Sequence, residues 1–324
     1  MKDTIVLYPS SGKGHLSPMV ELTNLILRRH AHSFSLTVVV SILPNDPDSI
    51  VPYISSVSAS APSISFLHLP CTSLPRPASS SHVDLGLLYY ELTCLNNPSL
   101  RELLLSLPGV KAVVLDFFCS AASEISTAIG IPTYYFLTAG TYCLVSFLST
   151  PTLNEKYPDF KDMDAGEVVE IPGYPPLSPQ DMPLVVSDKS HGIYSFFLNT
   201  ANDMSKSAGI ILNTFEKLEP GALEVVREGL CVPGGRNLPM YCIGPVVVAG
   251  DGDGARHKCL TWLDHQPIRS VLFLSFGSMG ILSGKQLKEI AVGLEKSGLR
   301  FLWVARIPRP DDETRQADGG GKWD

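Results

Sequence analysis

The sequence predicts an α/β protein in which a parallel sheet is covered by helices on both faces. Short apolar runs alternate along the chain with longer segments of helical periodicity, as strands and helices do in this class. The runs are apolar throughout rather than at every second position, as expected of strands buried on both faces. At 324 residues the chain is long enough for two domains of ordinary size.

The elements of the first domain follow in order along the chain. Residues 5–30 read as a strand, a loop of glycine and serine, and a helix whose apolar stripe ends in Arg28, Arg29 and His30, cations that suit the negative end of a helix. The predicted strands are 4–8, 36–42, 64–69, 111–116, 132–137 and 208–212. The predicted helices lie near 17–30, 84–107, 119–129, 139–149, 190–205 and 215–230.

The rest of the chain predicts a long loop, a linker and a second α/β unit. Residues 150–188 contain many prolines and little periodicity, so we expect a long ordered loop over the sheet. The predicted organisation is an N-terminal domain at 1–245, a Gly/Asp-rich linker at 246–257 and a second domain that begins at 258. The second unit is predicted to contain helix 258–265, strand 270–276, helix 284–297 and strand 300–305.

Composition and charge exclude several classes of partner. A net charge of −7 and a pI near 5.6 argue against nucleic acids and anionic membranes, which favour a basic face. The longest apolar stretch, 134–148, is shorter than the ~20 residues that a bilayer requires, and the N-terminus does not resemble a signal peptide. Seven cysteines without a CxxC pair do not suggest a disulfide framework. We therefore expect a cytoplasmic protein without a membrane span.

The loop around Gly12 and Gly14 does not match either familiar phosphate-binding motif. A P-loop would need glycine at Leu7 and a hydroxyl residue at Gly14, and a dinucleotide fingerprint would need glycine at Ser17. What remains is a loop that lets the backbone approach a ligand at the carboxyl end of the first strand, where open α/β sheets bind their ligands.

His15 and Asp116 are the candidate catalytic pair. His15 stands at or just before the first helical turn, where the helix dipole favours a neutral imidazole that could accept a proton. The alternative is a histidine that caps the helix or bonds a carbonyl group. Asp116 ends the fourth strand at the same edge of the sheet, where it could orient the imidazole, or could instead cap the segment that begins near Cys119.

Other chemistries receive little support from the sequence. The eight histidines are scattered without an HxxxH pair, so we expect no metal site, and no GxSxG elbow suggests a serine nucleophile. The turn Ser275–Gly280 between a strand and a helix could hold a phosphate, or could be a plain turn. A nucleotide-dependent oxidoreductase is disfavoured by the failed fingerprint.

Seven segments together resemble the plant UDP-dependent glycosyltransferases that act on flavonoids, isoflavones, chalcones and other small phenols. They are PSSGKGHLSPMVEL (9–22), VVLDFFC (113–119), FLTAGT (136–141), GIILNTFEKLEP (209–220), YCIGPV (241–246), CLTWLDHQPIRSVLFLSFGSMG (259–280) and RFLWVAR (300–306). The resemblance covers nearly the whole chain. It implies a GT-B fold, with one Rossmann-like domain for the acceptor and a second for the nucleotide sugar.

The resemblance also implies a reaction and roles for individual residues. His15 matches the general base that deprotonates the acceptor hydroxyl, and Asp116 matches the carboxylate that orients it. Gly14, Thr138 and Ser278 match positions near the UDP-sugar, and Phe118 matches a wall of the acceptor pocket. The implied reaction is transfer of a hexose, in the first place glucose, with inversion and without a metal or other cofactor.

The family's donor-binding signature lies beyond the last residue of this sequence, so we expect the second domain, 258–324, to be incomplete. This expectation raises an alternative from a different class. The chain could be a catalytically silent binding module that holds a phenolic ligand or associates with another protein through the exposed half domain.

Overall fold

The structure, a computed structural model, describes residues 2–42, 47–70, 82–247, 257–277 and 282–305. The chain divides into two compact units, Met1–Val248 and Ala249–Asp324, and each is described by itself. Most of the predicted linker at 246–257 lies outside the described residues.

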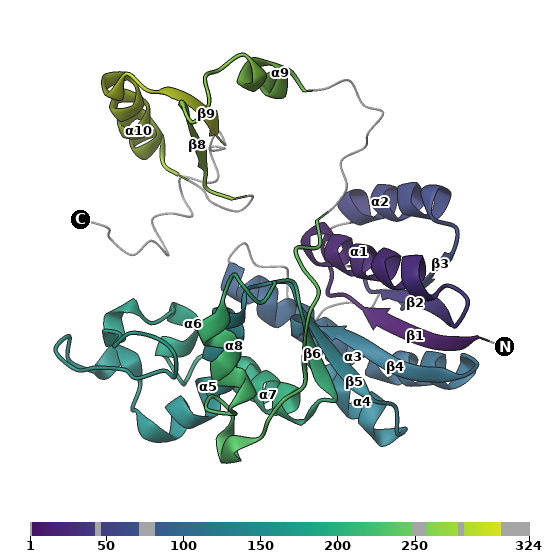
Figure 1. The fold of residues 1–324 in the computed structure, drawn as a ribbon. Helices are drawn as coiled ribbons and strands as arrows, with labels where there is room; N and C mark the ends of the chain where they lie inside the picture. Colours follow the sequence, from purple (N-terminus) through teal and green to yellow (C-terminus); the bar gives the residue numbers. More distant parts are fainter. Residues whose placement is uncertain (1, 43–46, 71–81, 248–256, 278–281, 306–324) are drawn as a thin grey trace. The chain divides into compact units, whose positions relative to one another are not determined.

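The first unit is built on a seven-stranded sheet with the strand order β3-β2-β1-β4-β5-β6-β7 (Figure 1). Every neighbouring pair of strands in it is parallel. The strands are β1 (Asp3–Tyr8), β2 (Phe34–Val40), β3 (Ile64–His68), β4 (Val110–Asp116), β5 (Thr133–Leu137), β6 (Gly209–Leu212) and β7 (Met240–Cys242). The predicted parallel sheet and its strands are thus confirmed.

The strand order reverses between β1 and β4. From β1 the chain moves outward through β2 to β3, then crosses back to β4 and continues outward in the other direction. Tyr8, the last residue of β1, pairs with Leu115, so the carboxyl ends of these two strands lie side by side. Such a reversal opens a crevice at the carboxyl edge of the sheet, where ligands of α/β proteins bind.

Helices cover both faces of this sheet (Figure 1). On one face lie α1 (Lys13–His30) and α2 (Pro47–Ser60). On the other face lie α3 (His82–Ser106), α4 (Ser123–Ala128), α5 (Thr141–Lys156), α7 (Gly192–Lys206) and α8 (Pro220–Arg227). Successive strand residues therefore enter different cores, Val6 and Tyr8 on the α3 side and Leu7 on the α1 side, as the two-residue period of a strand requires.

Helices α1 and α2 differ from the sequence-based expectation. α1 begins at Lys13 rather than near 17, because the amide of Leu16 donates to the carbonyl of Gly12 over 3.1 Å and starts the helix there. α2 was not predicted, since its serines and Pro52 are poor helix formers. The helix is stabilised instead by packing, because Ile50, Ile54 and Val57 recur at helical spacing and are buried.

The segment predicted as one long loop, 150–188, contains more regular structure than expected. Helix α5 continues through Pro151 to Lys156, so its predicted end at 149 was wrong. Three short helices follow: η2 (Phe160–Asp162), η3 (Pro179–Asp181) and α6 (Leu184–Ser187). Phe160 and Val169 are buried in the core on the α3 side, and they anchor this segment to the domain.

The second unit contains α9 (Lys258–Asp264), β8 (Val271–Ser275), α10 (Gly284–Ser297) and β9 (Arg300–Val304). Its two strands are parallel, and Ser283 and Gln286 form a reciprocal capping box at the start of α10. The apolar sequence of these strands is typical of burial on both faces, but a unit of so few residues covers them only in part, as expected of an incomplete domain. Phe273 is 62% exposed and Phe301 is 40% exposed.

Within the part of the chain that the structure describes, no helix combines the length and the apolar character needed to cross a bilayer.

Candidate active site

His15 is the third residue of α1, at the carboxyl end of β1 and beside the reversal of strand order. Gly12 is the N-cap of this helix, and its carbonyl accepts hydrogen bonds from the amides of His15 and Leu16 at 3.2 and 3.1 Å. Gly12 has a φ of 112°, a conformation that favours glycine, and an added Cβ would lie 3.2 Å from the hydroxyl of Tyr89. Gly12 therefore sets the position of His15, a role that the sequence analysis did not assign to it.

The structure brings His15 and Asp116 together. Nδ1 of His15 lies 3.0 Å from Oδ2 of Asp116, the last residue of β4. The other carboxylate oxygen, Oδ1, accepts a hydrogen bond from the amide of Phe118 at 3.1 Å and caps the short helix η1 (Phe117–Ala122). Asp116 thus contacts His15 and also caps η1, two arrangements that the sequence left as alternatives.

The two side chains differ in exposure, as a base and its buried partner would. The side chain of His15 is 29% exposed and that of Asp116 is 3% exposed. Burial lowers the pKa of His15, but attraction and hydrogen bonding by Asp116 outweigh burial and raise it above its ordinary value. The sequence analysis expected the helix terminus to keep the imidazole neutral, and the carboxylate reverses that direction.

Aromatic side chains surround the His15 ring. The ring of Phe118 meets it edge-on, with centroids 5.4 Å apart, and Tyr89 of α3 does so at 6.1 Å. Phe196 of α7 stacks on Phe118 at 5.6 Å with an interplanar angle of 11°. The sequence analysis named only Phe118 for this wall. The sequence holds one signal for the other two rings: aromatic residues stand in adjacent pairs at 89–90 and 196–197, both within predicted helices.

Of the three residues expected near the UDP-sugar, two lie among the described residues. Gly14 is the second residue of α1 and is exposed, with open space around the position that a Cβ would take. Thr138 is half-buried and directly follows β5, at the same edge of the sheet as His15. Ser278 lies outside the described residues.

Glu219 binds the first turn of α5, the helix that follows Thr138. Its carboxylate accepts hydrogen bonds from the amides of Thr141 and Tyr142, at 2.8 and 3.3 Å, and from the hydroxyl of Thr214 at 2.9 Å. Burial raises the pKa of Glu219, but these hydrogen bonds outweigh it, so the pKa is lowered overall. Glu219 caps α5 from a distant part of the chain, which local sequence patterns could not indicate.

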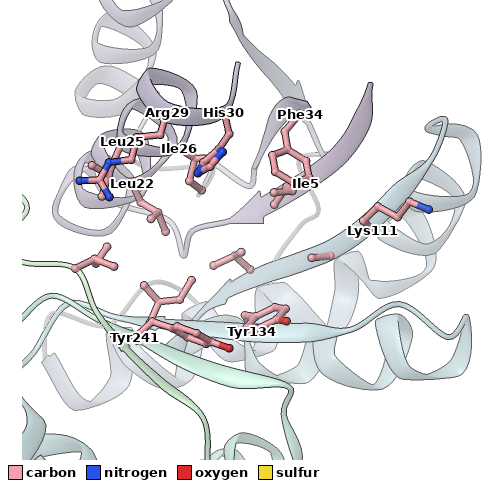
Figure 2. A pocket seen from close by; sticks show the side chains of 14 residues that line it. Ile5, Leu22, Leu25, Ile26, Arg29, His30, Phe34, Lys111, Tyr134 and Tyr241 are labelled. Carbon is pink, nitrogen blue, oxygen red and sulfur yellow. The ribbon is translucent and has the colours of Figure 1, made fainter. Parts of the chain in front are cut away.

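A separate pocket of about 440 Å³ lies along α1, away from these residues (Figure 2). Its lining is mainly apolar and includes Ile5, Leu22, Tyr134 and Tyr241, with Arg29, His30 and Lys111 among the polar members. Ile5 and Tyr134 stand near the amino ends of their strands, opposite the edge that holds His15. The pocket therefore contains no predicted site residue.

Among the described residues, no group of three or more His, Cys, Asp or Glu side chains is arranged to hold a metal ion.

Comparison with known proteins adds independent information. No family model matches the chain. The chain is 44% identical over 314 residues to UDP-glycosyltransferase 88B1 of Stevia rebaudiana, a match that covers 95% of this chain and 66% of that protein. It is 40% identical over 344 residues to a phloretin 2'-O-glucosyltransferase of Malus domestica, covering 100% of this chain and 70% of that protein.

Solved structures give the same result. A UDP-glucosyltransferase of Polygonum tinctorium capable of glucosylating indoxyl, in complex with 3,4-dichloroaniline, aligns with a TM-score of 0.81 at 31% identity, over 97% of this chain and 67% of that one. UGT2 of Phytolacca americana, complexed with UDP-2-fluoro-glucose and pterostilbene, aligns with a TM-score of 0.79 at 31% identity, over 98% and 70%.

These matches confirm the predicted fold class, a GT-B type α/β fold, and the predicted resemblance. The chain spans only about two thirds of the length of the relatives it matches, 66% in the first case above. Its similarity nevertheless extends along almost all of its own residues, in sequence and in fold. The chain belongs to the plant UDP-glycosyltransferases.

Proposed function

We propose that this chain takes part in transfer of a hexose, in the first place glucose, from a UDP-sugar to a hydroxyl group of a small phenolic acceptor such as a flavonoid. His15 is the general base and Asp116 is its partner. The observation that carries the proposal is the 3.0 Å contact between Nδ1 of His15 and Oδ2 of Asp116 at the switch point of the sheet. Relatives named as phloretin and anthocyanidin glucosyltransferases support the substrate class.

The contact determines which nitrogen does the chemistry. Because Nδ1 faces a carboxylate, it carries the proton in the neutral ring and donates a hydrogen bond to Asp116, which leaves the lone pair on Nε2. Nε2 takes the proton of the acceptor hydroxyl as its oxygen forms a bond to the anomeric carbon. The bond from that carbon to the UDP oxygen breaks on the opposite side, so the configuration inverts. Asp116 stabilises the imidazolium that results.

The aromatic wall suits a phenolic acceptor. Phe118 and Tyr89 present ring edges to His15, and Phe196 stacks behind Phe118. Flat aromatic ligands pack well against such rings, and edge-to-face contacts add to the area that is buried. A phenol held here would have its hydroxyl group within reach of the imidazole, which is the geometric requirement for general base catalysis.

The donor side of the proposal rests on Gly14, Thr138 and Ser278. Gly14 leaves open space at the start of α1 and Thr138 follows β5 at the same edge, and both are proposed to approach the sugar. Ser278 is proposed to approach the diphosphate. Proton transfer by His15 requires neither a metal nor another cofactor in this scheme. We place the reaction in the cytoplasm, because the six cysteines among the described residues are free thiols.

The test is transfer from UDP-glucose to phloretin by the purified chain, read by mass spectrometry, with His15→Ala as the paired variant. The proposal predicts a glucoside with the unaltered chain and its loss with the variant, while phloretin still binds to both. If the unaltered chain binds phloretin and forms no glucoside, transfer by this chain is contradicted. If the variant forms product at the normal rate, His15 is not the base.

A second candidate function is binding without transfer, through association of the second unit. Its favouring observation is the exposure of large apolar side chains on β8 and β9: Leu272 is 41% exposed, Phe273 62% and Phe301 40%. Sedimentation at several protein concentrations tests it. Growth in size with concentration that Phe273→Ser reduces would support association, and a monomer at all concentrations that turns over UDP-glucose would contradict it.

A further inference from the structure

Gly86 occupies a place in α3 where glycine is unfavourable. It is the fifth residue of a 25-residue helix, and it is buried. Glycine in a helix interior loses more backbone entropy on folding than alanine does, and it contributes no side chain to the core. A buried glycine at such a position therefore suggests that a neighbouring group occupies the space that a side chain would fill.

That neighbouring group is the ring of Phe118. A Cβ atom built on Gly86 would lie 2.8 Å from Cε1 of Phe118, compared with 3.6 Å from Cδ1 of Ile193. Non-bonded carbon atoms pack at about 3.5–4.0 Å, so the first distance is an overlap and the second is an ordinary contact. Any side chain at position 86 must displace the Phe118 ring or move α3 itself.

The Phe118 ring is half-buried and contacts other rings. It meets the His15 ring edge-on at 5.4 Å and 84°, and it stacks on Phe196 at 5.6 Å and 11°. The ring of Phe117 meets it edge-on from another side, at 5.3 Å and 88°. A displacement of Phe118 by a side chain at position 86 therefore changes its packing against these rings, that of His15 included.

The same face of α3 also borders His15 directly. Tyr89 stands three residues after Gly86, a spacing that places both residues on one face of the helix. The ring of Tyr89 lies 6.1 Å from the His15 ring at an angle of 75°, and 5.9 Å from that of Phe118. One helix face thus supplies a ring at position 89 that neighbours both His15 and Phe118, and a space at position 86 into which Phe118 fits.

We propose that Gly86 is a positioning residue of the active site: its missing side chain lets Phe118 lie against His15, and this contact fixes the orientation of the His15 ring and the width of the acceptor pocket beside it. Gly86 acts through Phe118 and touches no reacting atom. The inference rests on the proposed function for the meaning of the pocket, but the contact between positions 86, 118 and 15 can be tested without turnover.

The chain offers a matched control. Gly192 is the first residue of α7 and faces α3, and its added Cβ would lie 3.4 Å from Cδ2 of Leu87, an ordinary contact. Gly192→Ala makes the same chemical change between the same pair of helices, without an overlap with an aromatic ring.

The first experiment is proton–carbon NMR of chain labelled at its histidine rings, with the His15 signal assigned by its loss in His15→Gln. We expect Gly86→Ala to move the His15 ring signals and Gly192→Ala to leave them in place. In a Phe118→Leu background the ring is absent, so adding Gly86→Ala should cause no further movement. Unmoved His15 signals in Gly86→Ala, or equal movement with and without the Phe118 ring, would overturn the proposal.

Phloretin binding by calorimetry gives a second readout. Gly86→Ala is expected to weaken binding at least tenfold, while Gly192→Ala stays within twofold of the unaltered chain. The double variant Gly86→Ala/Phe118→Leu should bind as Phe118→Leu does. If the unaltered chain does not bind phloretin, the proposed function fails on that acceptor, and the NMR comparison still decides the role of Gly86.

The same variants also show whether an overlap with Phe118 is what prevents Gly86→Ala from folding, should it not fold. If Gly86→Ala does not fold but the double variant with Phe118→Leu does, the overlap with Phe118 is confirmed, and the His15 signals of Phe118→Leu then show whether that ring orients the imidazole. If neither folds, α3 requires glycine for a reason unrelated to Phe118, and the proposal is overturned.

Discussion

Nδ1 of His15 lies 3.0 Å from Oδ2 of Asp116, although 101 residues separate them in the chain. The contact follows from the topology of the sheet, because β1 and β4 are neighbours and their carboxyl ends meet where the strand order reverses. The carboxylate is almost fully buried and cannot turn away to solvent. A fixed carboxylate beside a partly exposed imidazole is the arrangement from which the proposed proton transfer follows.

Asp116→Asn should lower the rate of transfer by about 10²–10⁴-fold, the usual contribution of a positioned general base. The amide keeps the size of the side chain but neither stabilises the imidazolium nor enforces the tautomer with the lone pair on Nε2. Initial rates of glucosylation at saturating phloretin would measure the change. Asp181→Asn, at an exposed position in η3, is the matched control and should leave the rate unchanged. Equal rates for the two variants would contradict the role of Asp116.

The acid side of the pH profile should report the pKa of His15. Burial lowers this pKa, but Asp116 raises it by more, so the folded value lies above the ordinary 6.5. Below the raised pKa the imidazole is protonated and cannot act as a base, so kcat/KM should rise with pH as the ring loses its proton. In Asp116→Asn the raising influence is gone, and the acid limb should move to lower pH. An acid limb that stays in place, or moves upward, would be inconsistent with this coupling.

The same pair makes a signed contribution to stability. Because the folded pKa of His15 is raised, the contribution is fully present below the unfolded value of 6.5 and is lost as pH rises through the folded value. The difference in free energy of unfolding between the unaltered chain and His15→Gln should therefore be larger at pH 6 than at pH 8.5. Urea unfolding at the two pH values measures it, and a difference that grows with pH would have the wrong sign.

Glu219→Ala should destabilise the first unit by about 1 kcal/mol, the usual cost of losing a helix cap. The amides of Thr141 and Tyr142 lose their acceptor, and the hydroxyl of Thr214 loses its partner. Glu216→Ala is the comparison, because that carboxylate is 71% exposed and pairs with Arg227 at the surface. Its cost should be about 0.5 kcal/mol or less. Thermal unfolding of both variants compares their losses of stability. A larger loss in Glu216→Ala than in Glu219→Ala would contradict the capping role of Glu219.

Particular residues mark how far the sequence alone could lead. The contact between His15 and Asp116 was predictable, because the carboxyl ends of buried parallel strands meet at one edge of the sheet. The packing of Tyr89, Phe196 and Gly86 against Phe118 was not predictable. They lie on helices, where the direction of each side chain depends on the rotation of the helix and on packing between elements distant in sequence.

The secondary structure, too, contains elements that the sequence predicted and elements that it did not. The strands of the sheet were predictable from apolar runs, but α2 was missed. Ile50, Ile54 and Val57 recur at helical spacing, yet the serines and Pro52 of this segment weigh against a helix. The exposure of β8 and β9 cannot be read from their own apolar residues, but it was expected from the small number of residues that this unit has to cover them.

The central claim, that His15 and Asp116 act as one unit, is tested most directly by a double-mutant cycle on transfer from UDP-glucose to phloretin. Rates are measured for the unaltered chain, His15→Ala, Asp116→Ala and the double variant. The account predicts that the double variant is no slower than His15→Ala, because without the imidazole the carboxylate has nothing to orient. If the two losses multiply in the double variant, the residues act independently and the proposed pair is wrong.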